Sequence, residues 1–175
     1  MPSSNDNREH LRTVNLVGAL AVAFSDRIRS ATEEAMGQGA AAPAAIVQIG
    51  TNAGESIDAL SRTLALSHSA TVRIVERLQS DGLVKKIRGT DARVSELTLT
   101  AAGRRAMADV LAGRQDVISG ALSSLTRTDW SDLTRLVEKI LPNLVDSRAE
   151  SDYACRLCDE SSCPQSRCPA DCDAE

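Results

Sequence analysis

Aromatic side chains are scarce in this sequence: Phe24, Trp130 and Tyr153 are the only ones in 175 residues. The hydrophobic content is nevertheless 42%, so the core must be built mainly from Ala, Leu, Val and Ile. No run of 18 or more apolar residues occurs, which argues against a membrane-spanning helix. The first residues also lack the basic start and apolar stretch of a signal peptide. We therefore expect a soluble, cytoplasmic protein.

Signatures of catalysis are missing as well. The chain has no Gly-rich phosphate loop, and its two histidines, His10 and His68, do not lie near a nucleophile in the sequence. All five cysteines lie in the last 21 residues, far from either histidine. The sequence therefore does not predict an enzyme.

The net charge of −4 looks unsuited to DNA binding, but the charge is unevenly distributed. From Glu150 onward the chain carries seven acidic and two basic side chains, so the rest of the chain is slightly basic. Residues 68–93 carry six basic side chains against three acidic ones. Phosphate binding depends on a local basic surface and not on the total charge. The composition therefore permits a DNA-binding protein.

Hydrophobic periodicity predicts a mainly α fold with a small β-hairpin. Apolar residues at spacings of three and four predict amphipathic helices, and two β-prone segments with Gly89 and Asp91 between them predict the hairpin. The expected helices span 11–37, 43–51, 57–64, 68–81 and 100–122, with a last helix capped by Thr128. The expected strands span 83–87 and 94–99.

The helices over 57–64 and 68–81 are spaced as a helix-turn-helix. Ser56 and Ser67 are expected N-caps, and Gly82 supplies a left-handed stop after the second helix. A basic hairpin follows directly, which is typical of a winged helix-turn-helix. The side chains expected to face the core are Leu60, Leu64, Val72, Val75 and Leu78.

The second helix of this motif is predicted to enter the major groove of DNA. Arg73 is placed to make two hydrogen bonds to a guanine edge, whereas Arg77, one turn further on, is expected to contact a phosphate. In the hairpin, Asp91 is expected to orient Arg93 for insertion into the minor groove. The predicted DNA-binding residues are Ser67, His68, Ser69, Thr71, Arg73, Arg77, Arg88, Asp91 and Arg93. The alternatives are an ordinary polar helix face and a surface ion pair between Asp91 and Arg93.

The segment Ser69–Arg104 closely resembles the MarR family of bacterial transcriptional regulators. The resemblance rests on Thr71-Val72, on the run from Glu76 to Leu83, on Asp91-x-Arg93, and on the Leu-Thr-Leu-Thr sequence that precedes Gly103. The order of elements fits over roughly residues 11–147.

The resemblance implies a winged-helix homodimer whose first and last helices interleave and whose two wings grip a pseudo-palindromic operator. Proteins of this kind usually repress transcription, and an effector loosens their grip on DNA. The sequence itself agrees, because the apolar stripes over 17–31 and 133–145 are too long for one small core to bury.

This chain also departs from its relatives in ways that bear on the signal it senses. Some relatives sense peroxide through a cysteine near the first helix, but here no cysteine precedes Cys155. Zinc-sensing relatives use His and acidic ligands within the domain, and only two histidines are present. Relatives that bind phenolic effectors need a pocket that the scarce aromatic residues would line poorly. The C-terminal tail is therefore the expected sensor.

The chain is expected to divide into a DNA-binding and dimerisation domain, residues 1–149, and a cysteine-rich tail, residues 150–175. The tail cysteines are Cys155, Cys158, Cys163, Cys168 and Cys172. Four thiolates satisfy either tetrahedral Zn²⁺ or an iron–sulfur cluster, and the first four cysteines are the expected ligands, with Cys172 as an alternative. A metal-free thiol–disulfide switch is a third possibility, and a purely structural metal clip is the one that carries no signal.

Two other functions remain open at this stage. One is a regulator gated by a small molecule, in which the zinc tail is only structural. The other is an adaptor that keeps the winged helix but binds a protein partner in place of DNA. A DNA-binding regulator can be distinguished from an adaptor by replacing Arg73, Arg77 and Arg93. Their removal should abolish DNA binding and leave an adaptor's partner binding intact.

Overall fold

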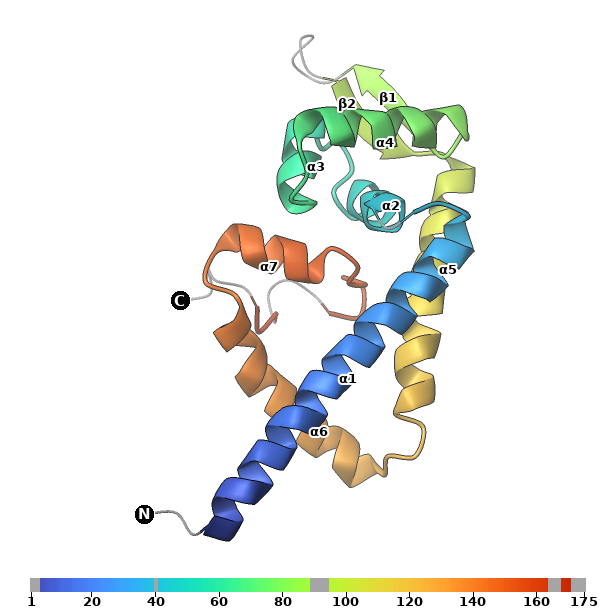
Figure 1. Cartoon of the computed structure of the whole chain (residues 1–175). Helices are drawn as coiled ribbons and strands as arrows, with labels where there is room; N and C mark the ends of the chain where they lie inside the picture. The colour runs from blue at the N-terminus through green and yellow to red at the C-terminus, as the bar shows by residue number, and fades with distance from the viewer. Residues whose placement is uncertain (1–3, 40, 89–94, 164–167, 171–175) are drawn as a thin grey trace.

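The computed structural model describes residues 4–39, 41–88, 95–163 and 168–170 of the chain. Within these residues the protein is mainly helical with one two-stranded antiparallel sheet, as the sequence predicts (Figure 1). The elements in order are α1 (Ser4–Met36), α2 (Ala41–Thr51), α3 (Ile57–Thr63), α4 (His68–Ser80), β1 (Val84–Arg88), β2 (Ser95–Leu99), α5 (Ala101–Ala121), α6 (Arg127–Ile140), the 3-10 helix η1 (Leu141–Leu144) and α7 (Arg148–Cys155).

Local hydrogen bonds fix where α3, α4 and α5 begin. The side chains of Ser56, Ser67 and Thr100 each accept the backbone N–H of the third residue that follows, at 3.0–3.2 Å. These bonds satisfy donors that the first helical turn leaves without partners. Gly82 follows the end of α4 and has a φ of +70°, a left-handed conformation that costs glycine little. The predicted caps and the predicted stop are therefore confirmed.

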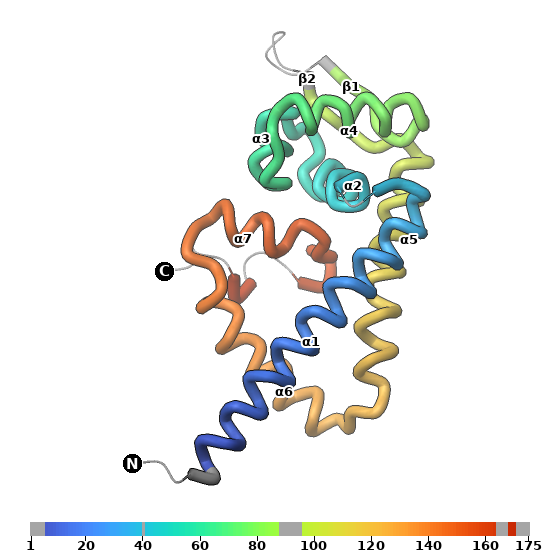
Figure 2. The backbone as a smooth tube through the Cα atoms, in the orientation of Figure 1, coloured from blue at the N-terminus to red at the C-terminus, as the bar shows by residue number. Residues whose placement is uncertain are grey.

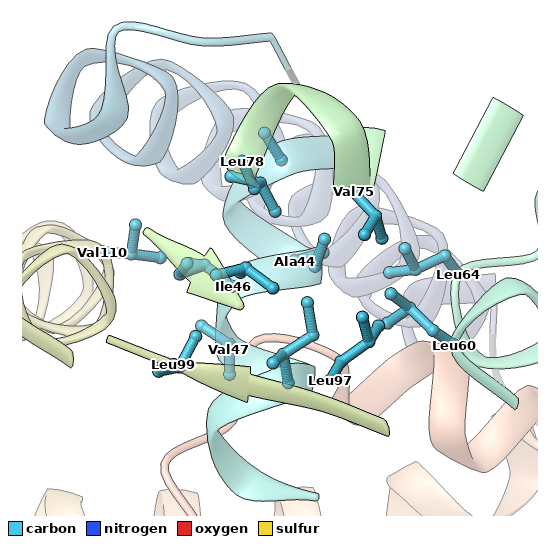
Figure 3. Packing of buried hydrophobic residues seen from close by; sticks show 14 residues of the cluster. Ala44, Ile46, Val47, Leu60, Leu64, Val75, Leu78, Leu97, Leu99 and Val110 are labelled. Atoms are coloured by element: carbon cyan, nitrogen blue, oxygen red, sulfur yellow. The ribbon is translucent and has the colours of Figure 1, made fainter. Parts of the chain in front are cut away.

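The core is aliphatic and centres on α2, which is buried from Ala42 to Ile49 (Figure 3). Val75 and Leu78 of α4 cover α2 from one side, and Leu97 and Leu99 of β2 pack against it from the sheet. The remaining large buried side chains of this cluster are Ile46, Val47, Ile49, Leu60, Leu64, Val84 and Val110. This composition agrees with the core expected from a sequence with few aromatic residues.

One predicted core position is wrong. The buried stripe of α4 is Thr71, Val75 and Leu78, and Val72 is only half-buried. These three residues are spaced by four and three, so they share one helix face, from which Val72 is turned away. The buried Thr71 hydroxyl is satisfied because it donates to the Ser67 carbonyl oxygen at 3.1 Å.

The long helices extend away from this core. α1 packs along α5, and α6 runs back from the far end of α5 (Figure 1). α1 begins at Ser4, earlier than the predicted residue 11. The N-cap of α6 is Thr126 and not the predicted Thr128, because Thr126 and Asp129 form a reciprocal capping box.

Two glycines allow close packing between the core and α5. An added Cβ on Gly103 would lie 2.0 Å from the Leu83 carbonyl oxygen, which itself accepts the Thr100 N–H at 3.0 Å. An added Cβ on Gly50 would lie 2.2 Å from the Met107 sulfur. Because both positions lack a side chain, α5 lies directly against the start of the hairpin at Gly103 and against α2 at Gly50.

The first part of the C-terminal tail folds back toward α3. α7 packs against α3, with Ser151 buried (Figure 2). Leu157 contacts the edge of the core cluster, and Ala170 is also buried. The boundary expected between residues 149 and 150 falls inside α7. The sequence analysis did not anticipate this helix.

Candidate nucleic-acid interface and cysteine cavity

Helix α4 lies on the outer face of the molecule beside the hairpin, where its polar side chains are accessible (Figure 1). His68, Ser69, Arg73 and Arg77 are all exposed, as predicted for a recognition helix. Ser67 is also exposed, and its side chain caps the helix. The exposed face of α4 therefore carries two guanidinium groups and several hydrogen-bonding groups.

Two of these side chains are held by neighbouring carboxylates. His68 Nδ1 lies 2.7 Å from Asp58 Oδ1, which links the start of α4 to α3. Arg77 Nε donates to Asp81 Oδ2 at 3.2 Å, and Gln38 Nε2 donates to the same oxygen at 2.6 Å. Exposed pairs of this kind contribute little stability, so they can exchange for contacts with another anion.

Thr71 does not belong to this face. It is fully buried, and its hydroxyl is used within the helix, as described above. The prediction that Thr71 offers its side chain to DNA is therefore corrected, because Thr71 packs α4 against the core.

The hairpin supplies further positive charge next to α4. Lys85 and Lys86 of β1 are exposed, and Arg88 is the last residue of this strand, paired in register with Ser95. Asp91 and Arg93 lie outside the described residues. The positions of Lys85, Lys86 and Arg88 fit the basic wing that the sequence predicts.

A second set of predicted residues meets in a cavity of about 220 Å³ below α2 and α3. Four cysteines of the tail line it: Cys155, Cys158, Cys163 and Cys168. The opposite wall comes from α2, α3 and the segment between them, with Gln48, Asn52, Glu55 and Thr63. We call this space the cysteine cavity. Cys172 lies outside the described residues.

The thiols in the cavity influence one another. The Cys155 thiol hydrogen-bonds to Cys158, which lowers the pKa of Cys158 to about 6, with a smaller contribution from the Arg114 guanidinium. The same hydrogen bond raises the pKa of Cys155, and burial adds to this increase. Cys168 also contacts Cys155, and burial raises the pKa of Cys163. All four described cysteines are free thiols.

The four thiols form one connected cluster, because Cys155 interacts with both Cys158 and Cys168, and Cys163 interacts with Cys168. Among the residues that the structure describes, no three Cys, His, Asp or Glu side chains are gathered as a metal ion would need.

Glu55 is a member of the cavity wall that the sequence analysis missed. Its Oε2 atom is buried without a hydrogen-bond partner among the described residues. Burial raises the pKa of Glu55, nearby Asp152 raises it further, and Arg62 opposes the shift. No motif marks this residue in the sequence, because its role depends on the tail folding back against α3.

Comparison with solved structures identifies the fold. YusO from Bacillus subtilis superposes with a TM-score of 0.66 at 21% identity, covering 79% of this chain and 97% of that protein. A MarR family protein from Bacillus stearothermophilus superposes with a TM-score of 0.65 at 22% identity, covering 77% of this chain and 94% of that protein. A MarR family transcriptional regulator from Silicibacter pomeroyi superposes with a TM-score of 0.57 at 21% identity, covering 75% of this chain and 92% of that protein.

The chain thus has the MarR-type winged-helix fold that its sequence resembles. No protein-family model and no curated protein sequence matches it. Within the described residues, none of the helices combines the length and apolarity that crossing a bilayer requires.

Proposed function

We propose that this protein is a DNA-binding transcriptional regulator, most simply a repressor, that acts as a homodimer on a pseudo-palindromic operator. The observation that carries the proposal is the exposed, basic face of α4 beside the basic hairpin. The same fold occurs in a transcriptional regulator of the MarR family. A helix presented in this way fits the major groove of B-DNA.

Each basic residue has a defined task in this proposal. Arg73 is exposed near the middle of α4 and reads a base edge. Arg77 exchanges its contact with Asp81 for a DNA phosphate, and Lys85 and Lys86 contact phosphates from the hairpin. Arg93, which lies between the two strands in the sequence, reaches the minor groove in this proposal.

The proposal of a homodimer is supported by apolar side chains left exposed on the long helices. In the first half of α1, Val17 and Leu20 are 54% and 50% exposed. On α6 and η1, Ile140 and Leu144 are 50% and 70% exposed. Several large apolar side chains exposed on the long helices favour an interaction site there, and a second copy offers the matching helices.

The DNA-binding proposal is tested with duplexes selected by the full-length protein from a random-sequence pool. Fluorescence anisotropy on a selected duplex should show affinity that falls steeply with salt, because phosphate contacts release counterions. The variant Arg73→Ala/Arg77→Ala/Arg93→Ala should lose this binding and keep its dimeric state. Failure of the wild-type dimer to enrich any sequence, even in dilute salt, would overturn the proposal and favour an adaptor.

We also propose that the tail cysteines regulate operator affinity through a metal centre or through their redox state. The proposal is supported by the convergence of four thiols on one cavity. Cys155, Cys158, Cys163 and Cys168 would hold Zn²⁺ or an iron–sulfur cluster, with Cys172 as the alternative ligand. Either group would bind these four side chains as thiolates, so loading would release their protons.

Anaerobic purification followed by a visible spectrum and by iron, zinc and sulfide analysis identifies the centre. Operator affinity is then compared among the loaded protein, the protein stripped by reductant and chelator, and the protein oxidised to disulfides. Regulation predicts an affinity difference of about tenfold or more between two of these states. A colourless protein with one zinc per chain and the same affinity in all states would instead indicate a structural tail and a regulator gated by a small molecule.

A further inference from the structure

Cys155 and Cys158 form a Cys-x-x-Cys pair at the end of α7. The Cys158 N–H donates to the Cys155 carbonyl oxygen at 2.8 Å, which closes a tight turn between the two residues. A turn of this kind keeps its first and fourth Cα atoms within about 7 Å, and a disulfide joins Cα atoms that are about 4.4–6.8 Å apart. The backbone therefore already holds the two cysteines at a separation that a disulfide can bridge.

The two thiols of this pair are not equivalent. The Cys155 thiol hydrogen-bonds to the Cys158 sulfur, and the Arg114 guanidinium of α5 acts on the same sulfur. A sulfur that accepts a hydrogen bond and lies near a positive charge is the better nucleophile. Both side chains are half-buried and line the cysteine cavity. Cys158 is therefore placed to attack a molecule in the cavity, and Cys155 is placed to displace that molecule afterwards.

The charge of the cavity wall favours a small cation. Three carboxylates line the cavity, from Glu55, Asp152 and Glu160, against one guanidinium, from Arg148. Arg148 Nε donates to Asp152 Oδ1 at 2.9 Å, so this pair is neutral as a unit. The Glu55 Oε2 atom is buried with no hydrogen-bond partner among the described residues. An ammonium group in the cavity would donate to that oxygen and offset its cost of burial.

The size of the cavity limits the molecule that can enter it. Its volume of about 220 Å³ is smaller than that of pockets for drug-sized ligands, which are about 300–1,000 Å³. The site therefore suits a small molecule that carries an amine and that reacts with a pair of thiols.

We propose that Cys155, Cys158 and the cysteine cavity form a thiol–disulfide exchange site for a small, amine-bearing disulfide. The Cys158 sulfur attacks one sulfur of this disulfide, whose S–S bond breaks as the mixed disulfide forms. The first small thiol leaves with the proton that Cys158 gave up. The Cys155 sulfur then attacks the Cys158 sulfur, the Cys155–Cys158 bond forms, and the second small thiol leaves with the Cys155 proton.

This reaction is balanced without a metal or a further oxidant. Two protein thiols are oxidised to one disulfide, and the small disulfide is reduced to two thiols. The inference rests on the proposed redox regulation for its effect on DNA binding, and it adds the reacting pair and the class of oxidant.

The test uses the full-length protein after treatment with reductant and chelator and removal of both. Two disulfides of similar size are the probes: cystamine, which carries two ammonium groups, and 3,3′-dithiodipropionate, which carries two carboxylates. Thiol loss gives the rate, and peptide mapping by mass spectrometry gives the cysteines that are joined. Each rate is divided by the rate of the same probe with the urea-unfolded chain, because the two probes differ in intrinsic reactivity.

Four variants assign the parts of the site. Glu55→Gln removes a cavity carboxylate and keeps the side-chain size. Glu34→Gln is the matched control, because Glu34 is exposed on α1 and is not among the residues described as lining the cavity. Cys155→Ser should stop the reaction at a mixed disulfide on Cys158, and Cys158→Ser should lose the fast reaction. Operator affinity is measured before and after oxidation of the wild type.

The normalised rate is expected to favour cystamine by about tenfold or more in the wild type and in Glu34→Gln, and this preference should fall by about threefold or more in Glu55→Gln. The expected product is the Cys155–Cys158 disulfide. A different pairing, an equally fast Cys158→Ser protein or the absence of a preference for cystamine would overturn the exchange site. If the site reacts as expected and operator affinity stays the same, the exchange site stands and the redox regulation falls. If the site does not react but operator affinity still depends on oxidation by another reagent, the regulation stands without this site.

Discussion

Replacing Gly103 with alanine should loosen the joint between the hairpin and α5. Gly103 lies in the first turn of α5, and a Cβ there would sit 2.0 Å from the backbone oxygen of Leu83. Ordinary contact begins at 3.4 Å, so the two backbones would have to separate by more than an ångström. The obstacle is a backbone carbonyl, which cannot rotate away as a side chain can.

The expected loss of stability follows from two terms. Forcing an extra methyl into a closely packed site costs about 1–3 kcal/mol. Moving the Leu83 carbonyl also weakens its bond to the Thr100 N–H, which contributes about 1 kcal/mol. The sum, about 2–4 kcal/mol, corresponds to a decrease in Tm of about 4–16 °C for a domain of this size.

Thermal unfolding monitored by circular dichroism, at one fixed chain concentration, measures this decrease. Gly120→Ala is the matched control, because Gly120 lies in the same helix and nothing approaches within 4 Å of its added Cβ. The control should be neutral or stabilising by up to about 1 kcal/mol. A Gly103→Ala protein that unfolds at the wild-type temperature would refute the packing described for this joint.

Three further predictions concern DNA, assembly and pH. Arg73→Ala should weaken operator binding by about 1–3 kcal/mol in fluorescence anisotropy, whereas Arg135→Ala on α6 should change it little; equal effects would argue against base reading by α4. Ile140→Asp should weaken self-association at least tenfold or so in sedimentation experiments, because it places a charge on an exposed apolar face; an unchanged dimer would place the interface elsewhere. Burial raises the pKa of Glu55, so the folded protein loses stability as the pH rises through that pKa. Glu55→Gln should therefore raise Tm at neutral pH and leave Tm unchanged in acid. A Tm difference that is the same in acid would contradict this assignment.

Features set by a few neighbouring residues could be predicted from the sequence. Ser56, Ser67 and Thr100 are caps because their side chains bond to backbone only three residues away. Gly82 stops α4 for an equally local reason. The exposed face of α4 also follows from periodicity, apart from Thr71. Thr71 and Val72 are adjacent, and hydrophobicity alone assigned the core position to valine, whereas the helix geometry buries threonine with its hydroxyl satisfied.

The cysteine cavity was only partly predictable, because it depends on contacts between distant segments. The spacing of the cysteines indicated a common site, and four of them do line one cavity. The wall formed by Gln48, Asn52, Glu55 and Thr63 could not be foreseen, since it requires α7 to pack against α3. No local signal in the sequence specifies that packing.

The close approach of Met107 to Gly50 has a consequence for any oxidation experiment on this protein. The Met107 sulfur occupies the space where a side chain at residue 50 would lie, between α5 and α2. Conversion to the sulfoxide would add a polar oxygen to this packed, half-buried site. Peroxide can therefore disturb the packing of α5 against α2 without reacting with a thiol. A thiol-selective oxidant, or a Met107→Leu background, distinguishes the effect of Met107 oxidation from a response of the cysteines.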